Sequence, residues 1–168
     1  MTQLIKSRST EDLAVKGPDS PEMRAAIFRL EDHLKTLPQV EIEYIHRFTP
    51  GVYAREMRVP AGVMCTGAIH KTEHISIFLE GKMLVPDEDG GSVEISAPMV
   101  EVAQPGIKRV GMALEDVRWI TVHKTDLTDV DEIMEQIVTN DFSEVEHLVE
   151  QQYRDCGAII HEAQEKDT

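Results

Sequence analysis

The sequence predicts a mainly β protein: an antiparallel β-barrel or sandwich with one helix before it and helices after it. Two observations predict this class. Residues 40–124 consist of short segments in which apolar and polar residues alternate, separated by turn residues. On both sides of that region the apolar residues recur at a helical period. A chain of 168 residues also suits a single domain. The segments we expect are a flexible arm at 1–19, a helix at 20–38, the barrel at 40–124 and an acidic helical extension at 125–168.

The first two segments are delimited by turn and capping residues. The arm is polar and ends at Gly17-Pro18. Ser20 can cap a helix whose first position suits Pro21, and Pro38 ends it. One face of this helix carries the apolar residues Met23, Ile27, Leu30, Leu34 and Leu37.

From residue 40 the apolar period changes from about four residues to two, as in half-buried strands. Turns such as 49–51 and 60–62 separate the strands, and 87–91 has the composition of a hairpin tip. The strands that this pattern predicts are 40–48, 52–59, 63–70, 74–80, 82–85, 92–95, 98–103 and 117–123.

After Thr125 two apolar stripes with helical spacing follow. The first comprises Val130, Ile133, Met134, Ile137 and Val138. The second comprises Val145, Leu148, Val149, Gln152 and Tyr153, with Ser143 and Glu146 spaced as a capping box and Gly157 as its end. Both stripes are typical of helices that dock on a core.

The charge excludes one class of partner. The chain has a net charge of −14, and residues 125–168 contain 13 acidic residues against two basic ones. A protein that tracks nucleic-acid phosphates needs a basic surface, so we expect no nucleic-acid partner. The acidic extension is interpreted as a solvated helical surface.

Location is predicted from the absence of targeting signals. No apolar run approaches the ~20 residues that a membrane span needs, and no secretory signal is visible. Cys65 and Cys156 are far apart and lack a CxxC spacing, which favours reduced thiols. We expect a cytoplasmic protein with no membrane partner.

His70 and His74 lie in the stretch with the most chemical information, Gly67 to Gly81. In one continuous strand the two residues would be about 13 Å apart, too far to share a metal ion. On a helix they would be adjacent, although the flanking alternation is strand-like. A tight reversal at 71–73 would bring the two imidazoles face to face, within reach of one ion at ~2.1 Å.

This stretch resembles the first motif of the cupin family: a Gly, two His one residue apart, a Glu after a short turn, and a closing Gly. His70 matches the second His, His74 stands in place of the Glu, and Ala68 falls at the first His. The segment from Gln104 to Arg109 is similar to the second motif, Pro-x-Gly-x-x-His, with Gln104 at the Pro and Arg109 at the His.

The resemblance covers about residues 40–124 and implies a cupin-like barrel. The segments PGVYAREM, GAIHKTEH and PGIKRVG also resemble uncharacterised cupin-like proteins of tailed phages. That likeness implies the fold rather than an activity. The resemblance to cupins also implies a homodimer, because cupin-like sheets often bury a face or an edge against a second copy.

One divalent transition metal, Fe, Mn, Ni or Zn, is the cofactor that the resemblance suggests. His70 and His74 would be its ligands, and Glu73 or His123 would supply a third group. The structural alternative is that these residues are hydrogen-bonded polar groups lining the barrel.

Arg109 suggests a different ligand, because a guanidinium in a barrel mouth clamps a carboxylate or phosphate. Arg109 could equally pair with a carboxylate of a neighbouring strand, Glu56, Glu73 or Glu101. Lys108 is expected to face the opposite way. Tyr53 and Arg55 share a strand face and are candidates to line the same mouth.

Three hypotheses about function follow, since this architecture hosts many. The first is a degenerate cupin that binds a small, anionic molecule through Arg109, Tyr53, Arg55 and His123. The second is a metal-dependent cupin enzyme built on His70 and His74. The third is a phage accessory protein that binds a host protein through its acidic extension. Nucleophile elbows, Walker loops and dinucleotide-binding motifs are absent from the sequence.

Overall fold

A computed structural model describes residues 21–87 and 91–149 of the chain. Its elements are α1 (Pro21–Leu34), β1 (Glu43–Thr49), β2 (Val52–Val59), β3 (Met64–Thr66), β4 (Ile69–His70), β5 (His74–Glu80), β6 (Lys82–Pro86), β7 (Ser92–Ser96), β8 (Met99–Ala103), β9 (Val110–Ala113), β10 (Val117–Lys124), α2 (Val130–Ile137), β11 (Val138–Thr139) and the 3₁₀ helix η1 (Phe142–Glu144). Every strand pair is antiparallel.

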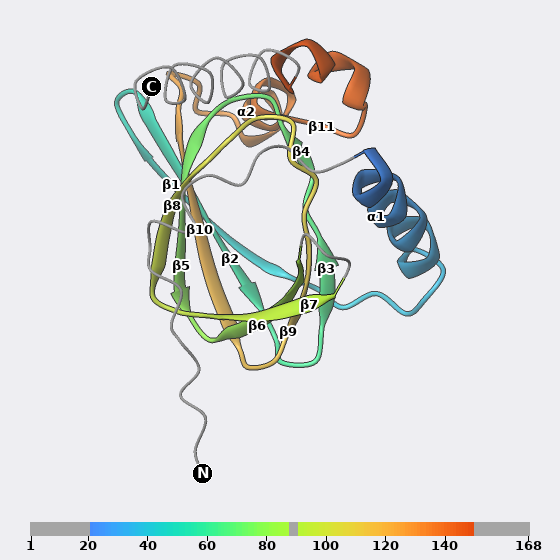
Figure 1. Ribbon diagram of the computed structural model, residues 1–168. Coiled ribbons are helices and arrows are strands. Elements are labelled where there is room, and N and C mark those ends of the chain that lie inside the picture. The colour runs from blue at the N-terminus through green and yellow to red at the C-terminus, as the bar shows by residue number, and fades with distance from the viewer. Residues whose placement is uncertain (1–20, 88–90, 150–168) are drawn as a thin grey trace, which may run out of the picture.

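Two sheets enclose the interior of the barrel. The larger has the order β1-β2-β10-β5-β8, and the smaller has the order β3-β9-β6-β7. A short pair of β4 and β11 lies at the end of the barrel where α2 packs, and α1 lies beside β3 (Figure 1). The predicted fold class, a mainly β antiparallel barrel with helices before and after it in the chain, is confirmed at the level of this architecture.

Three strands differ from the sequence prediction. One is β11, because Val138, which was predicted in the helical stripe, begins this strand. The expected strand 63–70 is divided, because β3 pairs with β9 while β4 pairs with β11 in a different sheet. The pattern did not predict β9, which contains Gly111 and lacks alternation. β9 is defined by its two neighbours, β3 and β6, rather than by its own sequence.

Helices α1 and α2 lie where the sequence predicted them, but α1 is shorter than predicted. α1 ends at Leu34 instead of Pro38, and Gln39 Nε2 donates to the carbonyls of Leu34 and Leu37 at 2.8 and 2.7 Å. α2 begins as expected, where Asp129 Oδ1 accepts hydrogen bonds from the backbone amides of residues 131 and 132. Among the described residues, no helix has the length and apolar character needed to cross a membrane.

The second C-terminal helix is only partly described. Asp141, rather than Ser143, caps the first turn there, because Asp141 Oδ1 accepts from the backbone amide of Ser143 at 2.9 Å. Val145 and Val149 of the predicted stripe are buried. The predicted positions Gln152, Tyr153 and Gly157 lie outside the described residues.

The core has two parts. Inside the barrel, Val59, Phe78, Met83, Ala113 and Val117 are buried, and Trp119 stacks on Phe78 with ring centroids 4.7 Å apart. Trp119, which is partly buried, therefore packs against this core. At the end of the barrel where α2 packs, Ile133 and Ile137 of α2 contact the fully buried Tyr53. The helix α2 is therefore docked on the barrel, as its apolar stripe predicted.

α1 is held by buried charged groups. The side chain of Lys108 is fully buried, and its Nζ forms an ion pair with Glu31 Oε2 at 2.5 Å. Arg24 stacks over the ring of Phe142 with a distance of 3.4 Å to its centroid. The loop before β9 and the region of η1 therefore both contact the first helix.

Replacing Gly81 by Ala is expected to lower the free energy of unfolding much more than replacing Gly62 by Ala. Both glycines have a positive φ, +93° and +80°, so each alanine costs about 1–2 kcal/mol of backbone strain. A Cβ at Gly81 would in addition collide with the backbone carbonyl of Asp116, whereas a Cβ at Gly62 meets nothing within 4 Å. Urea unfolding of the two variants measures the difference, and equal midpoints would contradict the expectation.

A candidate metal centre of three histidines

Three strands bring three histidines together at the α2 end of the barrel. His70 ends β4, His74 begins β5, and His123 lies near the end of β10. β5 pairs with β10 so that Ile75 is opposite Val122, which places His74 and His123 side by side on the inner face. The chain reverses between β4 and β5, and the rings of His70 and His74 stack with centroids 4.0 Å apart. Of the three geometries for this pair, the tight reversal is confirmed.

Backbone hydrogen bonds fix the position of His70. Its carbonyl accepts from the amide of Gly106 at 2.9 Å, and the next amide, that of Lys71, donates to the carbonyl of Ile137 at 2.8 Å. The loop before β9 and the end of α2 therefore hold the strand that carries this imidazole.

The geometry suits a shared ligand. One ring nitrogen from each of the three histidines lies within 4.8 Å of the others. The ring of His123 stacks on that of His70 at 5.2 Å and on that of His74 at 4.6 Å. Three nitrogens that bind one tetrahedral ion at ~2.1 Å are ~3.4 Å apart, so small side-chain rotations separate this arrangement from a coordinating one.

The hydrogen bonding of these nitrogens is incomplete. Within residues 21–87 and 91–149, His70 Nδ1 and both ring nitrogens of His123 are buried without a hydrogen-bond partner. His74 Nδ1 lies 3.3 Å from the carbonyl of Thr72, and a proton on Nδ1 would leave Nε2 with a free lone pair. Buried polar atoms normally have partners. These three imidazoles are therefore a group that could hold a metal ion.

The imidazoles are neutral at physiological pH. Burial lowers the pKa of His70 to about 2, with further lowering by His74, His123, Arg109 and Arg55. Burial and His74 lower the pKa of His123 to about 4, and burial is the main cause of the lowered pKa of His74. Neutral imidazole is the form that binds a metal ion.

Glu73, the carboxylate that we expected as a further metal ligand, lies outside this group of three. Its side chain is exposed, and its Oε1 accepts a hydrogen bond from Gln104 Nε2 at 2.8 Å. His123, which we expected either as a third metal ligand or as a ligand-binding group, occupies the third position.

Arg109 forms an ion pair with Glu101, with Nη1 and Oε1 2.9 Å apart, and its side chain is about half exposed. This partner is one of the three that the sequence left open. Arg109 is therefore already neutralised by a carboxylate, although its charge still lowers the pKa of His70 and His74. Lys108 faces the opposite way, as expected.

Tyr53 and Arg55 share the inner face of β2. Tyr53 is fully buried and its Oη lies 2.7 Å from His46 Nδ1, so its position is explained by packing. Arg55 stacks on the ring of Tyr44 at 4.0 Å and donates to the sulfur of Met134 at 3.5 Å. In the described part of the chain, Arg55 Nε is buried without a hydrogen-bond partner.

The sequence does not predict the contact between Met134 of α2 and Arg55 of β2. The apolar stripe predicted that α2 docks on a core, but no local signal places Met134 against Arg55, 79 residues away.

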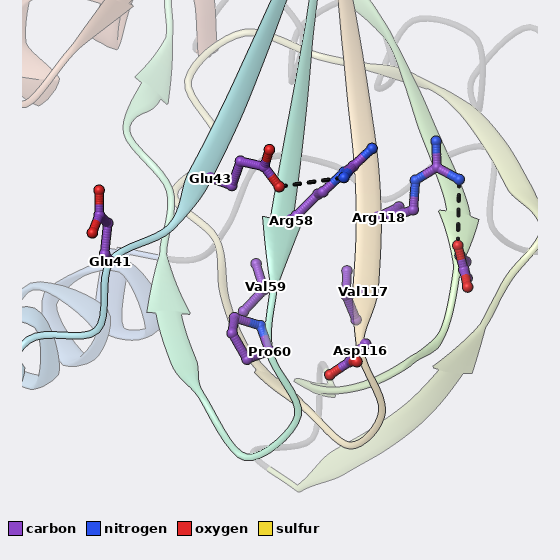
Figure 2. Close-up of a pocket in the computed structure, with 9 residues that line it drawn as sticks. Glu41, Glu43, Arg58, Val59, Pro60, Asp116, Val117 and Arg118 are labelled. Carbon is purple, nitrogen blue, oxygen red and sulfur yellow. Dashed lines mark hydrogen bonds and ion pairs between the residues drawn. The ribbon is translucent and has the colours of Figure 1, made fainter.

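A pocket lies at the end of β2 and β10 that is opposite to the three histidines (Figure 2). This pocket has a volume of about 460 Å³. Beside it, Arg58 and Arg118 both donate to the buried carboxylate of Glu56, and hydrogen bonds from Arg118 above all lower the pKa of Glu56 to about 2. Glu43 and Glu80 pair with the same two arginines. The arginines of this pocket are thus already paired.

Comparison with known proteins gives similarity of structure only. No family model matches the chain, and no curated protein matches it. A solved cupin domain from Bordetella pertussis Tohama I is 12% identical and covers 53% of this chain and 98% of its own, with a TM-score of 0.42.

Two further solved structures show similar values. A cupin-2 domain protein from Shewanella frigidimarina is 15% identical and covers 57% of this chain and 92% of its own, with a TM-score of 0.38. Ectoine synthase from P. lautus is 16% identical and covers 61% of this chain and 78% of its own, with a TM-score of 0.44. Cupin-domain proteins are thus among the solved structures to which this chain is similar.

Proposed function

We propose that the protein binds one divalent transition metal ion through His70, His74 and His123, and that the ion takes a small anionic ligand. The observation that carries this proposal is the convergence of three buried imidazoles whose ligand atoms lie within 4.8 Å of one another. The sequence suggested His70 and His74 as ligands and left the third open between Glu73 and His123; the proximity of the His123 imidazole to the other two supports His123.

The hydrogen bonding supports a metal ion over a purely structural cluster. A structural cluster would satisfy its own nitrogens, because each buried polar group without a partner costs about 1–3 kcal/mol. The two nitrogens of His123 have no such partner among the described residues. Three imidazoles favour Zn, Ni or Fe over Mn, which prefers oxygen ligands.

The coordination number supports an additional ligand. Three protein ligands leave at least one position open on a transition metal, as in catalytic rather than structural sites. When bound, the ion would act as a Lewis acid on the molecule in that position. A metal-dependent enzyme is therefore the second candidate function, favoured by this open position.

The surrounding charge supports an anionic ligand. Arg55 and Arg109 both lie close enough to lower the pKa of His70. Arg109 is paired with Glu101, whereas Arg55 has a buried Nε without a partner in the described segments. Arg55 is therefore the better candidate to bind a carboxylate or phosphate next to the ion. The cytoplasmic location, the phage origin and a host protein partner stay predictions.

The test is metal binding by the full chain without a His tag. We expect near-stoichiometric Zn, Ni or Fe by elemental analysis, or uptake of one ion per chain by calorimetry after chelation. A His70→Ala/His74→Ala variant should lose this ion while keeping its circular dichroism, and His33→Ala, which alters an exposed histidine of α1, should keep it. A folded parent protein that neither contains nor takes up these metals would overturn the proposal.

A further inference from the structure

A buried ion pair joins α1 to the loop that precedes β9. The side chain of Lys108 in this loop is fully buried, and its partner on the helix, Glu31, is 16% exposed. Lys108 Nζ also lies 4.9 Å from the centre of the Phe28 ring, one turn earlier on the same helix. A lysine is almost never fully buried without a partner, so α1 supplies what this loop needs in order to fold as it does.

This pair contributes position more than stability. Burial of two opposite charges costs a free energy of desolvation that their attraction seldom exceeds, and apolar residues of similar volume are often equally stable or more stable in their place. An apolar contact tolerates sliding, whereas an ion pair requires one distance and one direction. The pair between Lys108 and Glu31 therefore fixes the loop 104–109 relative to α1.

The loop 104–109 in turn holds the segment that carries a candidate metal ligand. The amide of Gly106 donates to the carbonyl of His70 at 2.9 Å. The carbonyl of Arg109 accepts from the amide of Gly67 at 3.0 Å. Segment 67–70, which contains β4, is thus hydrogen-bonded to this loop at both of its ends.

A second set of contacts leads from α1 to the residue after His70. Arg24 of α1 stacks on the ring of Phe142 in η1, at 3.4 Å from the ring centroid. Also in η1, Glu144 Oε2 lies 2.8 Å from Lys71 Nζ. Lys71 and Glu144 are partly exposed, and exposed ion pairs are weak, so the buried pair is the stronger of the two connections.

We infer that α1 positions His70 for metal binding through Glu31 and Lys108, and that docking of α1 and binding of the ion therefore strengthen each other. The inference rests on the proposed function, because it concerns a ligand of the same three-histidine site. A ligand that is already held in place loses less freedom when the ion binds, which raises the affinity. Glu31 and Lys108 act through the loop rather than on the ion, so they are positioning residues.

The test replaces the ion pair by apolar residues in the full chain, as Glu31→Leu/Lys108→Met. The urea midpoint of the chelated variant should equal or exceed that of the parent, because two buried charges are gone. Its dissociation constant for Zn, measured by calorimetry, should nevertheless be about 10-fold weaker or more, as for loss of an outer-shell partner. Hydrogen exchange of the Gly106 amide should be faster, because the loop that donates to His70 is less fixed.

The matched control makes the same two substitutions in an ion pair at another part of the barrel. Lys82 Nζ and Glu115 Oε1 lie 3.1 Å apart, and both side chains are about half exposed. The variant Glu115→Leu/Lys82→Met should keep the parent's Zn affinity and its exchange rate at Gly106. An equal loss of affinity in both double variants would contradict a specific role for α1.

The reciprocal effect can be measured in the parent protein, without any variant that must fold. By linkage, Zn should slow those amides of α1 that exchange by undocking of the helix by about the same 10-fold. Exchange of α1 that is unchanged by bound Zn overturns the inference, as does a folded Glu31→Leu/Lys108→Met variant with the parent's affinity. A parent that binds no metal is a different result, because it overturns the proposed function and the inference together.

Discussion

Replacing His123 by Leu is expected to abolish metal binding and, at the same time, to make the metal-free protein more stable. The side chain of His123 is buried, with 2% of the residue exposed, and neither ring nitrogen has a hydrogen-bond partner in the described parts of the chain. Leu has a similar volume and needs no partner. Removal of the unsatisfied nitrogens should raise the free energy of unfolding by about 1–2 kcal/mol. Metal affinity should fall by more than the ~100-fold that loss of an outer-shell partner causes.

Urea unfolding of chelated protein and calorimetric titration with Zn measure the two effects. His46→Leu is the matched control, because His46 Nδ1 lies 2.7 Å from Tyr53 Oη, which is fully buried. That variant orphans a buried hydroxyl and should therefore lose about 1–3 kcal/mol while it keeps the metal. A His123→Leu protein that loses stability without metal would mean that the imidazole has a structural partner, and it would contradict the metal assignment.

The three histidines show which part of the site could be predicted from the sequence. His70 and His74 are four residues apart, so a local reversal is enough to predict that they meet. His123 reaches them only because β10 pairs with β5 in one particular register, which alternation alone does not specify. The sequence therefore offered His123 as one option among several and could not select it.

The same limit applies to the charged residues. Arg109 and Lys108 are adjacent, and alternation correctly predicted that they face opposite ways. It did not predict that Lys108 would be fully buried against Glu31, since a buried Lys requires a partner that lies 77 positions earlier in the chain. Likewise, Glu101 of β8 neutralises Arg109, a pairing that alternation does not specify, and the proposed anion binder is therefore Arg55.

Strands with clear alternation were predictable, and those defined by their neighbours were not. β2, β5 and β10 match the expected ranges to within one residue because each has a regular period of two. β9 and β11 have four and two residues, too few to show a period. The apolar residues on the outer side of β5 were visible in the sequence, but only the register showed that they join those of β8 and β10 in one patch.

Metal-free protein is expected to lose stability steeply as the pH falls from about 6.5 to 4. In the unfolded chain a His titrates near 6.5, whereas in the folded protein the pKa of His70 is about 2 and that of His123 about 4. Between these values the unfolded state binds protons that the folded state excludes. The contribution of these neutral histidines to the free energy of unfolding is therefore complete above pH 6.5. It decreases as the pH falls, by up to about 1.4 kcal/mol per pH unit for each histidine. From pH 6.5 to 5 the loss is up to about 2 kcal/mol per histidine.

Urea unfolding at half-unit steps from pH 8 to 4 measures this slope. The His123→Leu protein should show a shallower slope, because one of the excluded protons is gone. Glu56 provides an internal contrast: its pKa is lowered from 4.5 to about 2, so its contribution is lost only below pH 4.5 and cannot explain a change at pH 6. A metal ion bound to the neutral imidazoles would add to the stability at pH 7 and would be released over the same interval, since protons compete for the same nitrogens. A stability that is constant between pH 7 and 5 would mean that the three imidazoles can be protonated in the folded protein, and hence that they are not held neutral for an ion.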